Sequence, residues 1–226
     1  MLPNAVVLLS GGLDSTTVLA IARERGFGCH CLSFNYGQRH YFELKAAADV
    51  ARAAGATHRV VRVELPWTAS ALTSASIAVP KGRPTSEMTR DVPVTYVSAR
   101  NMIFLAHAVS LAESLGAVDV FAGMNAVDYS GYPDCRPEFI ASFQATARLG
   151  TKVGIEGGEI TIHAPLIDMT KADIIRDGVR LGVDYGMTIS CYDPVGSTPC
   201  GACDSCQLRA MGFRDAGVID PTARVA

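Results

Sequence analysis

The chain has 226 residues, of which 49% are hydrophobic and 19% are charged. A chain of this size buries about 70% of the surface that its unfolded form exposes, and this composition excludes intrinsic disorder as the main state. The 20 Lys and Arg against 22 Asp and Glu leave a net charge of -2 with no basic run, which argues against wrapping of a nucleic acid because that requires a basic footprint.

Short apolar runs alternate with helical patterns from the N-terminus onward. Residues 5–9 form a continuous apolar run that is typical of a buried parallel strand, and it ends at two glycines. Residues 14–25 carry apolar side chains at helical spacing, and Gly26 follows them as a stop signal. The same alternation then predicts a strand at 27–34, a helix at 38–54 and a strand at 58–65.

Residues 67–95 break this rhythm, because a stretch rich in Ala, Ser and Thr is followed by several prolines. We interpret this segment as a lid over a site rather than as a linker between domains. Beyond it, the sequence predicts a helix at 98–115, a strand at 118–122, a polar loop at 123–137, a helix at 138–149, a strand at 160–162 and a helix at 171–181.

Strands that alternate with helices favour an α/β fold with a doubly wound, mostly parallel sheet and helices on both faces. Ligands of such sheets bind beyond the carboxyl ends of the strands, so we expect functional residues in the loops that follow strands. We divide the chain into an α/β domain at 1–188 and a C-terminal segment at 189–226 that packs on it.

The loop Ser10-Gly11-Gly12-Leu13-Asp14-Ser15 follows the first predicted strand. Its glycines lack the β-carbons that would keep phosphate oxygens from the backbone, and the next helix offers free N–H groups. Asp14 can hold Mg²⁺ or cap that helix. The Gly-Lys-Ser/Thr ending of an ordinary P-loop is absent, which favours chemistry at the α-phosphate with pyrophosphate as leaving group.

This loop resembles the signature of the PP-loop ATP pyrophosphatase superfamily, whose members adenylate a carbonyl or carboxyl oxygen and release pyrophosphate. The resemblance implies an adenine nucleotide alpha hydrolase-like fold, with ATP and Mg²⁺ as cosubstrate. It also implies the following ATP-binding residues: Leu8, Leu9, Ser10, Gly11, Gly12, Leu13, Asp14, Ser15, Thr16, Thr17 and Val18.

Four of the seven cysteines crowd the C-terminal end, at Cys191, Cys200, Cys203 and Cys206. Four thiolates fit tetrahedral zinc and leave no open coordination position, so we predict one structural Zn²⁺ per chain. A zinc deaminase is excluded, because it requires His-x-Glu and none of the five histidines is followed by Glu at two residues. An iron–sulfur cluster or a persulfide, as in PP-loop enzymes that thiolate tRNA, stays open as an alternative.

The N-terminus and the apolar stretches bear on location. Residues 5–9 have no basic residue before them and glycines directly after, which is unlike a signal peptide. The longest strongly apolar stretch, residues 102–112, is interrupted by His107 and Ser110 and falls short of the roughly 18 residues of a membrane span. We therefore expect a cytoplasmic protein without a membrane partner.

Several loops carry polar and aromatic side chains that can recognise a flat heterocycle and its anionic groups. Together with the phosphate loop and the cysteines, they resemble the 7-cyano-7-deazaguanine synthase family of queuosine biosynthesis over almost the whole chain. The departure is Ser98, where the family usually has proline. The motifs that carry the resemblance are Tyr36-Gly37-Gln38-Arg39-His40, Arg100-Asn101, Asp128-Tyr129-Ser130-Gly131-Tyr132-Pro133-Asp134-Cys135-Arg136 and Cys200-Gly201-Ala202-Cys203.

The resemblance implies a ligase that converts 7-carboxy-7-deazaguanine and ammonia, through adenylated intermediates and the amide, to the nitrile. It also implies a homodimer. Neither a general base nor the source of ammonia follows from it, and a tRNA-thiolating enzyme or a non-catalytic nucleotide-binding protein stays as the alternative. The candidate substrate-binding residues are Arg39, Arg100, Asn101, Asp128, Tyr129, Asp134 and Lys171.

Overall fold

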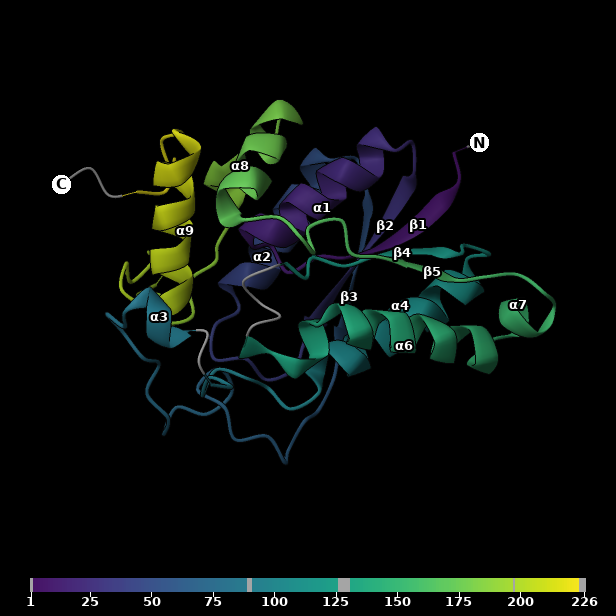
Figure 1. Ribbon diagram of the computed structural model, residues 1–226, viewed down its shortest axis with the longest axis horizontal. Coiled ribbons are helices and arrows are strands. Elements are labelled where there is room, and N and C mark those ends of the chain that lie inside the picture. The colour runs from purple at the N-terminus through teal and green to yellow at the C-terminus, as the bar shows by residue number, and fades with distance from the viewer. Residues whose placement is uncertain (1, 89–90, 126–130, 197, 224–226) are drawn as a thin grey trace.

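The computed structural model describes residues 2–88, 91–125, 131–196 and 198–223, and within them a five-stranded parallel sheet forms the centre (Figure 1). The strand order is β3-β2-β1-β4-β5, with every neighbouring pair parallel. This order confirms the predicted doubly wound sheet and places its switch point between β1 and β4. The strands are β1 (Asn4–Leu8), β2 (Gly28–Asn35), β3 (Thr57–Arg62), β4 (Asp119–Phe121) and β5 (Thr161–His163).

Helices cover both faces of the sheet, as predicted (Figure 1). One face carries α1 (Leu13–Glu24), α2 (Phe42–Ala53), α8 (Lys171–Arg180) and α9 (Asp204–Ala216). The other carries α4 (Arg100–Ser114) and α6 (Pro137–Gly150). Shorter elements are α3 (Thr85–Met88), α7 (Lys152–Ile155) and the 3-10 helices η1 (Pro133–Cys135) and η2 (Tyr185–Met187).

The central strand β1 shows why a continuous apolar run was the right signal for this sheet. Successive side chains of a strand point to opposite faces. Val7 accordingly joins the core under α1, whereas Val6 joins the core under α4, and both are fully buried. A strand covered on both sides therefore needs apolar residues at every position.

Two helices begin later than predicted, each for a local reason. The helix predicted from residue 38 begins at Phe42, because the Gln38 side chain instead bonds the backbone at the end of β2. The helix predicted from residue 98 begins at Arg100, because Ala99 has a left-handed backbone with φ of 52°. Helices α7 and α9 were not predicted. None of the helices in the described ranges has the length and apolar character needed to cross a membrane.

The segment at 67–95 is attached to the C-terminal segment by backbone contacts. Lys81 forms an antiparallel bridge with Cys203, and the Gly82 N–H donates to the carbonyl of Ala202 at 2.8 Å. Buried side chains of both segments form a small third core that includes Val79. The segment is therefore held in place at the cysteines, while its action as a lid stays a prediction.

The C-terminal segment also reaches the phosphate loop. The Ile189 N–H donates to the carbonyl of Gly11 at 3.0 Å, and the Ser190 hydroxyl accepts from the Leu13 N–H at 3.3 Å. The division at residue 188 thus cuts through contacts that support the loop, and a division into two domains stays a prediction.

Candidate active site

The loop after β1 folds as a tight turn that requires its first glycine. Gly11 has φ of 82°, and a β-carbon there would lie 2.4 Å from the carbonyl oxygen of Glu43 and 2.7 Å from the nitrogen of Ala47. Neither contact is tolerable, so the loop packs against the backbone of α2 only with glycine at this position. Gly12 then forms the N-cap of α1 without a side-chain cap, which leaves N–H groups of the first turn free for an anion.

Serine hydroxyls complete this loop. The Ser15 hydroxyl lies 3.0 Å from that of Ser10 and accepts from the Ser10 N–H at 3.1 Å. On the opposite side, a β-carbon added at Gly123, directly after β4, would come within 3.4 Å of the Ser15 nitrogen. The loop therefore lies in the crevice between β1 and β4, which is where ligands of doubly wound sheets bind.

A cleft opens from this loop toward the cysteines and is lined by residues from several separate segments of the chain. Of the predicted ATP-binding residues, seven line it: Leu8, Leu9, Ser10, Gly12, Leu13, Asp14 and Ser15. Gly11, Thr16, Thr17 and Val18 do not. Thr17 is fully buried and bonds the Tyr185 hydroxyl at 2.8 Å, and Val18 belongs to the core, so these two support the loop from behind.

Asp14 forms an ion pair with a predicted site residue from a distant helix. The Lys171 ammonium donates to Asp14 Oδ2 at 2.6 Å, and both side chains are largely buried. Within the described chain, the buried Oδ1 of Asp14 has no hydrogen-bond partner. Asp14 does not cap α1, so of its two predicted roles only that of Mg²⁺ ligand fits the structure.

Arg100 projects into the cleft from the first turn of α4. Its guanidinium donates to the Tyr36 hydroxyl at 3.1 Å and lies over the rings of Tyr36 and Phe104, at 5.4 and 5.9 Å from their centroids. A guanidinium carries five donors, and only this one side-chain bond is formed within the described ranges. The remaining donors suit a carboxylate or phosphate. The left-handed Ala99 aims this turn, which matches the concentration of backbone strain at functional sites.

Two further predicted residues contact each other beside Arg100. The Asn101 N–H donates to Asp134 Oδ2 at 2.9 Å, and its side chain donates to Cys135 Sγ at 3.1 Å. Asn101 lines the cleft, but Asp134 lines a separate hollow on the other side of η1. The predicted residues Asp128 and Tyr129 lie outside the described residues.

Arg39 lies between the phosphate loop and the cysteines. It lines the cleft and reaches Asp193 at 3.5 Å, and Asp193 also pairs with Lys81 at 2.9 Å and lies 3.6 Å from His40. A hydrogen bond from Lys81 holds the pKa of Asp193 below its usual range, so this carboxylate stays ionised. Arg39 is thus only partly neutralised and keeps donors for an anion in the cleft.

Glu43 is a cleft residue that the sequence did not reveal. It lies in the first turn of α2, lines the cleft, and accepts a hydrogen bond from Gln38 at 3.0 Å. Burial raises its pKa to about 7, although the charge of Arg100 opposes this shift. Acidic residues are common in the first turn of a helix because they interact favourably with the helix dipole. The sequence therefore gives no sign that Glu43 has a role in the cleft.

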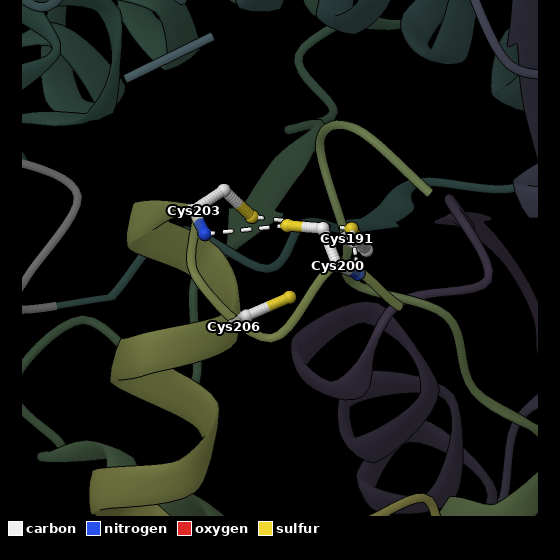
Figure 2. A group of neighbouring side chains, drawn as sticks. All are labelled: Cys191, Cys200, Cys203 and Cys206. Carbon is white, nitrogen blue, oxygen red and sulfur yellow. Dashed lines mark hydrogen bonds between the residues drawn. The ribbon is translucent and has the colours of Figure 1, made fainter. Parts of the chain in front are cut away.

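The four C-terminal cysteines converge on one point (Figure 2), and their sulfur atoms all lie within 4.8 Å of one another. Tetrahedral zinc with Zn–S bonds of about 2.3 Å would separate the sulfurs by about 3.8 Å, and Cys191 and Cys203 are 4.0 Å apart. Backbone N–H groups also donate to Cys191 Sγ and Cys200 Sγ. Hydrogen bonding of the Cys206 thiol to the sulfurs of Cys191 and Cys203 raises the pKa of Cys206, so the set ionises fully only around a cation.

The sequence of the chain matches a known family along almost its whole length. Residues 4–217 match the model of the family described as "Queuosine biosynthesis protein QueC". The chain belongs to the QueC family. This membership confirms the resemblance predicted from the motifs.

Named relatives of this QueC chain agree with the family match. A 7-cyano-7-deazaguanine synthase from Myxococcus xanthus is 58% identical over 224 residues, which cover 98% of this chain and 97% of that protein. One from Methylococcus capsulatus is 59% identical over 222 residues, covering 96% and 97%. Among solved structures, NMN synthetase from Francisella tularensis shares the fold, with a TM-score of 0.52 over 96% of this chain and 79% of that one at 16% identity.

Proposed function

We propose that this QueC chain is an ATP-dependent synthase that converts 7-carboxy-7-deazaguanine and ammonia, through the amide, into the nitrile 7-cyano-7-deazaguanine. The observation that carries the proposal is a single cleft in which a phosphate loop without a P-loop lysine faces Arg100. Such a cleft brings the α-phosphate of ATP to a carboxylate. The family match favours this function over a tRNA-thiolating enzyme and over a non-catalytic nucleotide-binding protein.

The reaction needs a carboxylate oxygen to become a good leaving group. Attack of that oxygen on the α-phosphate forms an acyl adenylate and expels pyrophosphate, and ammonia then displaces AMP to give the amide. The amide oxygen is adenylated in turn with loss of pyrophosphate and one proton, and loss of AMP and a second proton gives the nitrile. The protein contributes by positioning the two anions against each other and by offsetting their repulsion.

ATP occupies the phosphate loop in this proposal, with its site spanning residues 8–18. The N–H groups after Gly12 and the hydroxyls of Ser10 and Ser15 meet the phosphate oxygens. Mg²⁺ binds the free Oδ1 of Asp14, where it would neutralise charge on the pyrophosphate. Lys171 keeps that carboxylate ionised and in place through its 2.6 Å ion pair.

The deazaguanine substrate lies on the aromatic side of the cleft. Arg100 holds the substrate carboxylate, because its guanidinium lies over two aromatic rings and offers unused donors. Arg39 adds positive charge and Asn101 a hydrogen bond. Asp128, Tyr129 and Asp134 remain proposed contacts to the heterocycle on the ground of the family resemblance alone.

Zinc bound by the four cysteines has a structural role in this proposal. Four thiolates saturate the metal, so it supplies no open position for chemistry and serves to fix the C-terminal segment. Cys191 lines the cleft and Cys203 bridges to Lys81, so the metal would hold both the cleft wall and the segment at 67–95. A reducing, cytoplasmic location suits four reduced thiols, and the homodimer rests on the resemblance alone.

The experiment supplies 7-carboxy-7-deazaguanine, ammonium, Mg²⁺ and ATP to zinc-replete protein and seeks the nitrile by mass spectrometry. Arg100→Met serves as the site variant and Arg62→Met, in an exposed pair with Glu64, as the matched control. We expect nitrile from the wild type and the control, and little from the site variant. Absence of nitrile and of substrate-dependent pyrophosphate in the wild type would exclude the proposal.

A further inference from the structure

Glu43 is fixed beside the phosphate loop by its own backbone. The close approach at Gly11, where a β-carbon would lie 2.4 Å from the Glu43 carbonyl oxygen, shows that this turn of α2 lies directly against the loop. The Glu43 side chain lines the same cleft as the loop and Arg100. Its carboxylate therefore lies in the region where the α-phosphate and the substrate carboxyl group meet in the proposed function.

Gln38 orients this carboxylate through a side-chain amide that is itself held by hydrogen bonds to the backbone. Its Nε2 donates to Glu43 Oε1 at 3.0 Å and to the Phe34 carbonyl at 3.1 Å, while its Oε1 accepts from the Tyr36 N–H at 2.8 Å. Gln38 is only 5% exposed. In the part of the chain that the structure describes, Glu43 Oε2 has no hydrogen-bond or ion-pair partner, so one oxygen is available to a proton in the cleft.

The surroundings of Glu43 allow both its protonated and its ionised state to be populated near neutral pH. Burial raises its pKa to about 7, against the opposing charge of Arg100 and the hydrogen bond from Gln38. A base of this strength accepts a proton and returns it at neutral pH. The other titratable or charged side chains that line the same cleft are Asp14 from α1, Arg39 and His40 after β2, Arg100 from α4, Cys135 from η1, Cys191, Tyr36, Tyr132 and Tyr192.

We propose that Glu43 is the proton acceptor that turns bound ammonium into the nucleophile ammonia; this inference rests on the proposed function. Free ammonium carries no lone pair and cannot attack. Glu43 takes one proton, the nitrogen lone pair forms the C–N bond at the acyl carbon, and the C–O bond to AMP breaks with its electron pair leaving on AMP. The nitrogen then loses a second proton to water, which gives the amide.

The same carboxylate serves the second half of the reaction. Between the two halves, Glu43 returns its first proton to water. Adenylation of the amide oxygen leaves two protons on the nitrogen, and one of them passes to water, so that the adenylated amide carries one N–H proton on a carbon–nitrogen double bond. Glu43 removes that proton, its electron pair forms the third carbon–nitrogen bond, and AMP leaves as the C–O bond breaks. One base thus acts on nitrogen in both steps, which requires only that the ammonia attacking the acyl adenylate and the nitrogen of the adenylated amide occupy the same place.

The test uses Glu43→Gln, which keeps the size of the side chain and can still bond Gln38, with Glu64→Gln as the exposed control. In the first turnover, we expect the variant to release pyrophosphate on substrate at a rate close to that of the wild type. Amide formation from ammonium should fall about 100-fold to 1000-fold, within the usual contribution of a general base. Glu43→Asp, which keeps an ionisable group, should retain more activity than Glu43→Gln.

Hydroxylamine separates a missing base from a damaged site, because it is mostly neutral at pH 7 and needs no proton acceptor to attack. Hydroxamate formation by Glu43→Gln should stay within about threefold of the wild type. With ammonium, the wild-type rate should rise as the pH passes about 7, and the variant should follow only the concentration of free ammonia.

Full ammonium-dependent activity in Glu43→Gln would overturn the inference, as would equal losses with ammonium and hydroxylamine. A wild-type protein that releases no pyrophosphate on substrate would instead overturn the proposed function on which the inference rests.

Discussion

Replacing Gly11 by alanine tests the packing that shapes the phosphate loop. Two separable costs follow from the structure. A non-glycine residue in the left-handed region at φ of 82° costs about 1–2 kcal/mol. The added β-carbon would also lie 2.4 and 2.7 Å from backbone atoms of α2, and overpacking of this kind adds about 1–3 kcal/mol. Gly11→Ala should therefore lose about 2–5 kcal/mol of unfolding free energy.

Gly116→Ala is the matched control, because Gly116 has φ of 64° but nothing within 4 Å of an added β-carbon. It should lose only the conformational cost of about 1–2 kcal/mol. Urea unfolding of both variants at unchanged slope measures the difference directly. Equal losses in the two variants would refute the close approach of α2 to the loop.

Three further predictions concern distant parts of the structure. Lys171→Met leaves Asp14 without its 2.6 Å partner, and loss of a charge-assisted hydrogen bond of about 1.5–3 kcal/mol should weaken MgATP binding about 10-fold to 100-fold by calorimetry. Cys206→Ser removes one of four sulfurs and should abolish the zinc, measured by elemental analysis, with a large drop in melting temperature. Arg209→Met leaves the buried carboxylate of Asp220 without its ion-pair partner. It should lower the free energy of unfolding, measured in urea, by about 3–5 kcal/mol. Burial alone would raise the pKa of Asp220, but hydrogen bonds from Arg209 and Thr222 outweigh it, so the pKa lies below its ordinary value. A carboxylate with a lowered pKa stabilises the fold only while it is ionised, so wild-type stability should fall as the pH drops below about 4.

Each of these predictions has a control and a contradicting result. Lys45→Met breaks an exposed pair of similar length and should not change MgATP binding, so equal effects of both lysine variants would contradict the first prediction. Cys29→Ser should retain full zinc, and acid-labile sulfide with iron in the wild type would contradict the second. An Arg209→Met variant as sensitive to acid as the wild type would contradict the third.

The fold was predictable because its information is local. The central strand β1 lies between two layers of helices, so its short apolar run marks it as a buried strand. The predictions were wrong where one residue overrides the periodic pattern. Gln38 uses its side chain to bond the end of β2, and Ala99 adopts a left-handed backbone; neither is visible in hydrophobic spacing.

Residue patterns alone predicted the site where it is contiguous in sequence, whereas the scattered Arg39, Arg100, Asn101 and Lys171 came from the family resemblance. The phosphate loop and the cysteines are short motifs, and the sequence placed both. Ser190 bonds the Leu13 N–H across 177 positions, and Glu43 owes its raised pKa to burial in a cleft assembled from separate segments. Such properties arise from tertiary contacts, so they cannot be predicted from the spacing of residue types along the chain.

The central claim is that both oxygens of the substrate carboxylate leave as part of AMP. The direct measurement supplies 7-carboxy-7-deazaguanine whose carboxylate is labelled with heavy oxygen, together with ammonium and MgATP, and locates the label by mass spectrometry. The account predicts an unlabelled nitrile, two molecules of AMP per nitrile, and one heavy oxygen in each AMP. Label in water or in inorganic phosphate, with unlabelled AMP, would contradict it.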